Sequence, residues 1–122
     1  MSLRVLLVDD ATVNLDIIGS FLKAAGHSVT LAQSGQEAVE LAQKQIFDLI
    51  LMDIRMPEVD GLAAARQIRL GAGNASVPIL ALTAYGDDEA DFEAAGISGY
   101  LPKPLDYPTL IRGIDAAMAL RD

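Results

Sequence analysis

Three short segments rich in Val, Ile and Leu constrain the fold of this chain more than any other feature. They are Arg4–Val8, Phe47–Met52 and Val77–Leu82. Each is long enough for a buried strand and too short for a buried helix. Strands that are apolar at successive positions are typical of a parallel sheet covered by helices on both faces. Two shorter segments, Ser28–Ala32 and Gly99–Leu101, are predicted to complete a sheet of five strands.

Amphipathic segments separate these strands, and their periodicity predicts five helices. The expected ranges are 12–25, 35–45, 62–70, 87–95 and 106–120. Three of them begin with a capping signal. We expect Thr12 and Asp106 to cap the first and last helices, and Ser34 with Glu37 has the form of a capping box. The buried stripe expected on the first helix consists of Ile17, Ile18, Phe21, Leu22 and Ala25.

A strand followed by a helix, repeated five times in 122 residues, predicts a single α/β domain over residues 1–122. Its parallel sheet carries helices on both faces. Open sheets of this kind bind ligands outside the carboxyl ends of their strands. The residues that follow each strand are therefore the first candidates for a functional site.

The amino-acid composition excludes several classes of function. The chain has no Cys, which excludes disulfides, thiolate metal sites and cysteine nucleophiles. Seventeen acidic residues against nine Lys and Arg give a net charge of −8, which disfavours direct binding to nucleic acid. The apolar segments are too short to span a membrane, and the N-terminus lacks the pattern of a signal peptide. We expect a cytoplasmic domain without membrane association.

Polar side chains follow four of the expected strands. Asp9 and Asp10 follow the first, Asp53 ends the third, Thr83 ends the fourth, and Lys103 follows the fifth. Because the carboxyl ends of parallel strands share one edge of a sheet, we expect these side chains to converge. Each of them, taken alone, is common in ordinary loops and caps. Their shared position is what points to a site.

Three converging carboxylates require a compensating charge, since two unit charges ~4 Å apart repel by roughly 4 kcal/mol at an effective dielectric of 20. A hard divalent cation such as Mg²⁺ suits carboxylates and water. Such a site supports phosphoryl transfer, with Asp53 as the nucleophile that forms an acyl phosphate. Lys103 can neutralise the incoming phosphoryl oxygens, and the Thr83 hydroxyl can donate a hydrogen bond to one of them.

Four sequence segments also resemble the response-regulator receiver domains of two-component signalling. They are VLLVDD at 5–10, LILMDIRMPEVDG at 49–61, ALTA at 81–84 and GYLPKPL at 99–105. The segment 10–14 and the pair Met52-Asp53 are similar to receivers attached to hybrid sensor kinases. The resemblance implies a flavodoxin-like sheet in the order 2-1-3-4-5 and phosphorylation of Asp53.

The resemblance further implies roles for individual residues. Mg²⁺ is held by Asp9, Asp10, Asp53 and the backbone carbonyl of Arg55. Thr83 and Tyr100 form a switch, and Ala84 lies beside Thr83 in the matched segment. The peptide bond between Lys103 and Pro104 is cis, as only bonds before proline readily are. The implied partner is a histidine kinase or a histidine phosphotransfer domain, with homodimerisation on activation left open.

Two interpretations remain beside each other at this point. The first is a phosphorylation switch that takes a phosphoryl group from a partner phosphohistidine, promotes that transfer itself and slowly hydrolyses the product. Arg55 and Tyr85 are expected to border the phosphoryl group and to slow this hydrolysis. The second is a docking module that never turns over phosphate. A complete set of acids, Thr83 and Lys103 favours the first. The chain lacks the Asp-x-Asp motif that a phosphatase of another α/β family would carry after its first strand. It also lacks the P-loop motif of a nucleotide-binding site.

Overall fold

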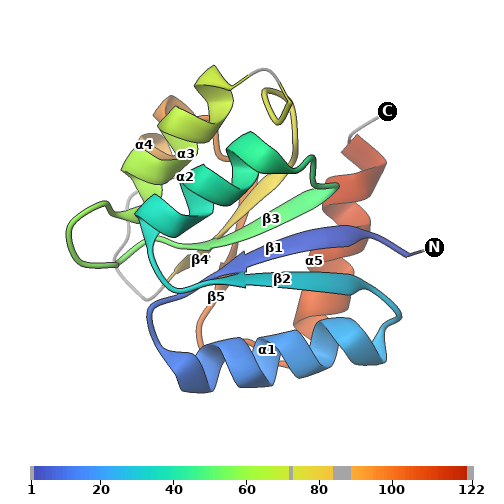
Figure 1. Ribbon diagram of the computed structural model, residues 1–122. Helices are drawn as coiled ribbons and strands as arrows, with labels where there is room; N and C mark the ends of the chain where they lie inside the picture. Colours follow the sequence, from blue (N-terminus) through green and yellow to red (C-terminus); the bar gives the residue numbers. More distant parts are fainter. Residues whose placement is uncertain (1, 72, 84–88, 121–122) are drawn as a thin grey trace.

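The computed structural model describes residues 2–71, 73–83 and 89–120 and shows a sheet between two layers of helices (Figure 1). Strands and helices alternate along the whole of this part of the chain. The strands are β1 (Arg4–Val8), β2 (Ser28–Ala32), β3 (Leu49–Asp53), β4 (Ile79–Thr83) and β5 (Gly99–Pro102). The helices are α1 (Thr12–Ala24), α2 (Gly35–Lys44), α3 (Gly61–Leu70), α4 (Glu89–Ala94) and α5 (Tyr107–Leu120).

All strand pairs are parallel, and the sheet has the order β2-β1-β3-β4-β5. The predicted fold class and strand order are therefore confirmed. The order reverses direction between β1 and β3, which is the point where such sheets bind ligands. In the described part of the chain, no helix combines the length and the apolarity that a bilayer crossing requires.

The sheet separates two hydrophobic cores. Leu6 and Val8 of β1 point into a core that α2, α3 and α4 cover, which we call the α2–α3 core. Val5 and Leu7 point into a second core under α1 and α5, which we call the α1–α5 core. Successive side chains of a strand point to opposite faces, so strands that are apolar throughout serve both cores. Figure 1 shows α1 and α5 on one side of the sheet and α2 with α3 on the other.

The N-terminus of α1 differs from the sequence prediction. Ala11 is the N-cap residue and has no side-chain cap, so the prediction that Thr12 caps this helix is wrong. The first helical hydrogen bonds close on the Ala11 carbonyl, which places Thr12 inside the first turn. The buried face of α1 is also rotated, because Leu15 is buried whereas Ile17 is 46% exposed.

The other predicted caps are present, and in the capping box the Glu37 side chain accepts the backbone N–H of Gln33, one residue before the N-cap, at 2.7 Å. The Glu37 backbone N–H donates to Ser34 Oγ at 3.1 Å, and the Thr109 backbone N–H donates to Asp106 Oδ1 at 2.8 Å. α3 has a cap that the sequence analysis did not assign, since the Ala63 backbone N–H donates to Asp60 Oδ1 at 2.9 Å. This cap starts α3 directly after the loop that follows β3.

Two polar side chains fasten the edge of the sheet that lies away from the strand carboxyl ends. Asn74 is buried, accepts the Phe47 backbone N–H at 2.9 Å and donates to the Ala42 carbonyl at 2.7 Å. Arg69 Nε and Nη2 donate to the Gly96 carbonyl at 2.9 and 2.6 Å. Burial lowers the pKa of Arg69, but a guanidinium remains charged in proteins, so these backbone carbonyls stabilise it. α3 is thereby tied to the turn after α4.

Candidate functional site

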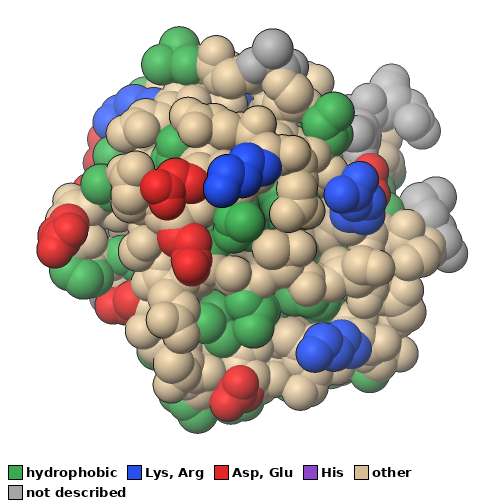
Figure 2. Space-filling view, viewed as in Figure 1, with side chains coloured by type: hydrophobic (Ala, Val, Ile, Leu, Met, Phe, Trp, Pro, Cys, Tyr) green, Lys and Arg blue, Asp and Glu red, His purple; other side chains and the backbone are tan. Residues whose placement is uncertain are grey.

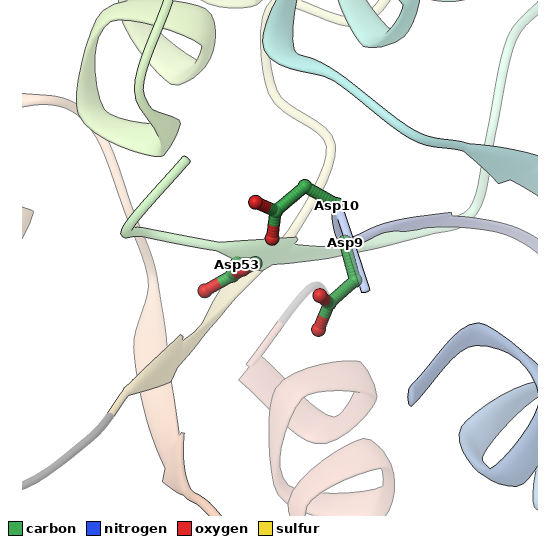
Figure 3. A group of neighbouring side chains, drawn as sticks. All are labelled: Asp9, Asp10 and Asp53. Atoms are coloured by element: carbon green, nitrogen blue, oxygen red, sulfur yellow. The ribbon is translucent and has the colours of Figure 1, made fainter. Parts of the chain in front are cut away.

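Three carboxylates meet at the carboxyl ends of β1 and β3 (Figure 3). Asp9 and Asp10 follow β1, and Asp53 is the last residue of β3. β1 and β3 are neighbours, with Val8 opposite Met52, so the residues after them are brought together by the pairing itself. One oxygen from each carboxylate lies within 4.8 Å of the others. Asp9 and Asp53 are buried, whereas Asp10 is exposed.

Lys103 reaches this cluster from the loop after β5. Its Nζ lies 2.9 Å from Asp53 Oδ1 and 3.4 Å from Asp9 Oδ2. Its backbone N–H donates to the Thr83 carbonyl at 2.7 Å, which fixes the loop against the end of β4. Burial by itself would lower the pKa of Lys103, but the hydrogen bond and the charge of Asp53, together with Asp9, outweigh it and raise that pKa. Lys103 is therefore a firmly charged ammonium between two buried acids.

The Asp53 carboxyl group is held in an unfavourable environment for a negative charge. Burial and the neighbouring charge of Asp9 raise its pKa above the usual range of an aspartate. The hydrogen bond and the charge of Lys103, and the Arg55 backbone N–H at 3.3 Å from Asp53 Oδ1, act in the opposite direction and are outweighed. A carboxylate that is desolvated and only partly neutralised is a stronger nucleophile than one in water.

The raised pKa of Asp53 predicts how stability depends on pH without metal. The folded state holds the Asp53 proton more tightly than the unfolded state, in which the pKa of an aspartate is about 4. The free energy of unfolding therefore loses the Asp53 contribution as the pH rises through the raised pKa. Urea unfolding of the wild type and Asp53→Asn in EDTA, from about pH 4 to about pH 7, should give a stability advantage for the variant that grows with pH. A difference that is constant with pH would contradict this environment for Asp53.

Asp9 has contacts of its own. It is 0% exposed, its Oδ1 accepts the Ala11 backbone N–H at 2.9 Å, and its Oδ2 lies 3.2 Å from Asn14 Nδ2. The sequence analysis did not assign Asn14 to the site. A signal was available, because Asn14 carries a side-chain donor in the first turn of α1, only five residues after Asp9.

The other predicted site residues lie around this cluster. Thr83 ends β4 and is buried, at 7% exposure, opposite Pro102 of β5. Tyr100 of β5 is 48% exposed, with its ring 6.1 Å from that of Phe92 in α4. The Lys103–Pro104 peptide bond is cis, as the family resemblance implied. The predicted site residues Ala84 and Tyr85 lie outside the described residues.

The first residue of α3, directly after the loop from β3, packs against the backbone of Asp53. Gly61 donates its backbone N–H to the Ile54 carbonyl at 3.0 Å. A Cβ atom at Gly61 would lie 2.3 Å from the Asp53 carbonyl oxygen and 2.7 Å from Ile54 Cα, which leaves no room for any side chain. Glu58 in the same loop has φ of 64°, a left-handed conformation that only a few non-glycine residues adopt. The position of Asp53 thus depends on a tightly packed loop.

The chemistry of this cluster fits a hard divalent cation. The available ligands are carboxylate oxygens, two of them buried and one exposed, without nitrogen or sulfur donors in the group. Oxygen ligands and partial access to water are what Mg²⁺ prefers. Figure 2 shows several acidic side chains on the left of the molecule, where the strands end, so the local field also attracts cations.

Comparisons with known proteins give the family. The response regulator receiver domain matches residues 5–115. The chain is 39% identical over 120 residues to the transcriptional regulatory protein ZraR of Escherichia coli K12, covering 97% of this chain and 27% of ZraR. It is also 39% identical over 112 residues to the signal transduction histidine-protein kinase BarA of the same strain, covering 90% of this chain and 12% of BarA. The chain thus spans only a minor part of the length of either relative. It is equally similar to a sensor kinase and to a transcriptional regulator, with 39% identity to each.

Solved structures agree with this. The receiver domain of sensor histidine kinase PA1611 from Pseudomonas aeruginosa is 38% identical, with a TM-score of 0.90 and coverage of 98% of this chain and 99% of that one. That crystal structure has a magnesium ion coordinated in its active site cleft. The chemotaxis response regulator CheY4 of Vibrio cholerae is 32% identical, with a TM-score of 0.90. With the match over residues 5–115 and the five-stranded fold, these findings show that the chain belongs to the response regulator receiver domains of two-component signal transduction.

Proposed function

We propose that Asp53 of this domain accepts a phosphoryl group from a partner phosphohistidine. The observation that carries this proposal is the contact of Lys103 Nζ with the buried Asp53 carboxylate at 2.9 Å, beside two further aspartates. An acid that is desolvated, oriented and paired with a movable ammonium is suited to attack an anionic phosphorus centre. Such an exchange belongs in the cytoplasm, where ATP supplies phosphoryl groups.

In the proposed step, the carboxylate oxygen of Asp53 that Lys103 does not engage attacks phosphorus. An O–P bond forms as the N–P bond to the donor imidazole breaks, and the electron pair of that bond stays on the imidazole nitrogen. With a proton on its other ring nitrogen, the donor imidazole leaves as a neutral group. Lys103 Nζ turns from the carboxylates to the phosphoryl oxygens and neutralises them as a point charge. The Thr83 hydroxyl donates a hydrogen bond to another of these oxygens. Hydrolysis by water later returns the Asp53 carboxylate and inorganic phosphate.

We assign the cation site to Asp9, Asp10, Asp53 and the backbone carbonyl of Arg55, with Mg²⁺ as the ion. When bound, Mg²⁺ supplies positive charge that offsets the carboxylates and the phosphoryl oxygens. Support comes from the three carboxylate oxygens within 4.8 Å and from the hard-donor chemistry of the group. Asp10 is exposed and gives the ion a path from solvent.

A test of the proposed function uses acetyl phosphate, a small acyl phosphate that needs no partner protein. The chain incubated with acetyl phosphate and Mg²⁺ should gain one phosphoryl group by intact mass, and hydroxylamine should remove it, since it cleaves acyl phosphates. Omission of Mg²⁺ should prevent labelling. A chain that gains nothing at saturating Mg²⁺ would instead be a docking module.

The donor is expected to approach between α1 and the loop that carries Lys103. A groove of about 300 Å³ lies there, lined by Ile17, Lys103, Pro104 and Leu105 among others. Ile17 and Val13 of α1 are exposed, at 46% and 61%. We propose that a histidine kinase or a histidine phosphotransfer domain places an apolar surface on these side chains. Direct nucleic-acid binding is not part of the proposal, because the net charge is −8.

The output is a change of the face formed by α4, β5 and α5. When the Thr83 hydroxyl turns to the phosphoryl oxygens, Tyr100, now 48% exposed, gains room to turn inward. When the Tyr100 ring moves from an exposed to a buried position, the shape of this face changes. Its affinity for partners, including a second copy of the chain, changes with it. We further propose that Arg55, with Tyr85, restricts the attacking water and prolongs the phosphorylated state.

Mg²⁺ should stabilise the fold without any phosphoryl donor. An ion that binds only the folded state contributes about 1.4 kcal/mol at ten times its Kd, which is roughly 5 °C in Tm for a domain of this size. Thermal unfolding in EDTA and in Mg²⁺ at matched ionic strength measures the shift. Asp10→Asn removes one exposed ligand and should reduce the shift at the same Mg²⁺ concentration. An equal shift in Asp10→Asn, or none in the wild type up to tens of millimolar, would contradict the assigned site.

A further inference from the structure

The Asp9 carboxylate is held by donors on both of its oxygens. Oδ1 accepts the Ala11 backbone N–H at 2.9 Å, and Oδ2 lies 3.2 Å from Asn14 Nδ2 and 3.4 Å from Lys103 Nζ. Asp9 is 0% exposed, so its orientation is determined by these protein groups and not by bulk water. A carboxylate only accepts hydrogen bonds, so the amide NH₂ of Asn14 must face it.

Lys103 cannot fix Asp9 by itself, because its ammonium is shared. It lies closer to Asp53, at 2.9 Å, than to Asp9, at 3.4 Å. In the proposed reaction Lys103 also turns to the phosphoryl oxygens. Among the described residues, the donor that remains on Asp9 Oδ2 when Lys103 moves is Asn14.

The backbone of Asn14 is fixed by the first turn of α1. Its N–H donates to the Ala11 carbonyl at 3.1 Å, and the Ala11 N–H in turn donates to Asp9. Asp9, the start of α1 and the Asn14 amide therefore form one closed unit of hydrogen bonds. A neutral amide orients the carboxylate without cancelling the negative charge that attracts a cation.

We propose that Asn14 is a positioning residue that orients the Asp9 carboxylate for cation binding. This inference rests on the proposed function only in taking Asp9 as part of the cation site. Residues that hydrogen-bond to a metal-binding group typically change metal affinity 10- to 100-fold when replaced. For Asn14, which shares Asp9 with the Ala11 N–H, we expect an effect at the lower end of that range.

The experiment compares Asn14→Leu with the wild type by calorimetric titration of Mg²⁺, with no phosphoryl donor present. Leu has a similar size and cannot donate, so the Kd for Mg²⁺ should rise roughly tenfold. Asn14→Gln restores a donor and should recover most of the affinity. Ser20→Ala is the control, since Ser20 is an exposed residue of the same helix whose hydroxyl donates to the Asp16 backbone carbonyl at 2.7 Å, and its Kd for Mg²⁺ should equal that of the wild type.

Labelling by acetyl phosphate gives a second measurement. In Asn14→Leu the Mg²⁺ concentration for half-maximal rate should rise roughly tenfold, while the rate at saturating Mg²⁺ stays within about twofold of the wild type. Should Asn14→Leu not fold, Asn14→Ala is titrated in its place. An unchanged Kd in the folded variant overturns the role of Asn14. A wild-type chain that binds Mg²⁺ but is never labelled overturns the proposed function alone, because the Mg²⁺ titration does not depend on labelling.

Discussion

Asp53→Asn should gain no phosphoryl group under conditions that label the wild type completely. The neutral amide keeps the size of the side chain but is a poor nucleophile, and an acyl phosphate requires the carboxylate. Asp53 is buried, with ligand oxygens of two other acids within 4.8 Å and Lys103 beside it. The substitution removes only the charge of Asp53 and leaves the charges of these neighbours in place. The measurement is the intact mass of both proteins after incubation with acetyl phosphate and Mg²⁺.

Two further variants make this test specific. Asp115→Asn removes an exposed aspartate of α5 and should be labelled as fast as the wild type. Asp10→Asn weakens the cation site and should be labelled slowly at low Mg²⁺ but fully at high Mg²⁺. A stoichiometric, hydroxylamine-sensitive phosphate on Asp53→Asn would show that another residue is the nucleophile.

Gly61→Ala should destabilise the domain by about 3 kcal/mol, because overpacking against atoms that cannot rotate away reaches the upper end of the usual range. The new Cβ would lie 2.3 Å from the Asp53 carbonyl oxygen and 2.7 Å from Ile54 Cα. Both are backbone atoms, so relief requires movement of β3 or of the loop. Since β3 ends in Asp53, labelling should also slow. Urea unfolding and the initial labelling rate measure the two effects.

Gly19→Ala is the matched control. Its Cβ would lie 3.8 Å from Leu31 Cδ2, an ordinary contact, and Gly19 is in the interior of α1. Alanine favours a helix over glycine by about 1 kcal/mol, so this variant should be more stable than the wild type. If Gly61→Ala unfolded at the same urea concentration as the wild type, the close packing of the start of α3 on Asp53 would be wrong.

The sequence was sufficient for the fold and for the placement of Asp9, Asp10, Asp53 and Lys103 at one edge. Both follow from long-range rules that depend on few details. Parallel strands that are apolar throughout need helices on both faces, and residues that follow neighbouring strands must meet. The segment Arg4–Val8 was predicted to the residue because the charged Arg4 begins it and two acids follow it.

The missed features depend on contacts that local patterns do not encode. Asn74 lies in a Gly- and Asn-rich connection that resembles a solvated loop, yet it bonds to backbone groups 27 and 32 residues away. Thr12 is a common capping residue, but the helix start is determined by how Ala11 bonds to Asp9. Asp60 could have been recognised, because an acid before an apolar periodic segment is a known helix start.

The separation of the interior into the α2–α3 core and the α1–α5 core has an evolutionary consequence. No buried side chain belongs to both cores among the described residues, so a substitution on one side is compensated on that side. Stability changes on opposite sides should add, as they do for sites without shared contacts. Lineages that duplicate such a domain can therefore alter the helices on one side for a new partner and keep the other side, and the strand ends between them, unchanged.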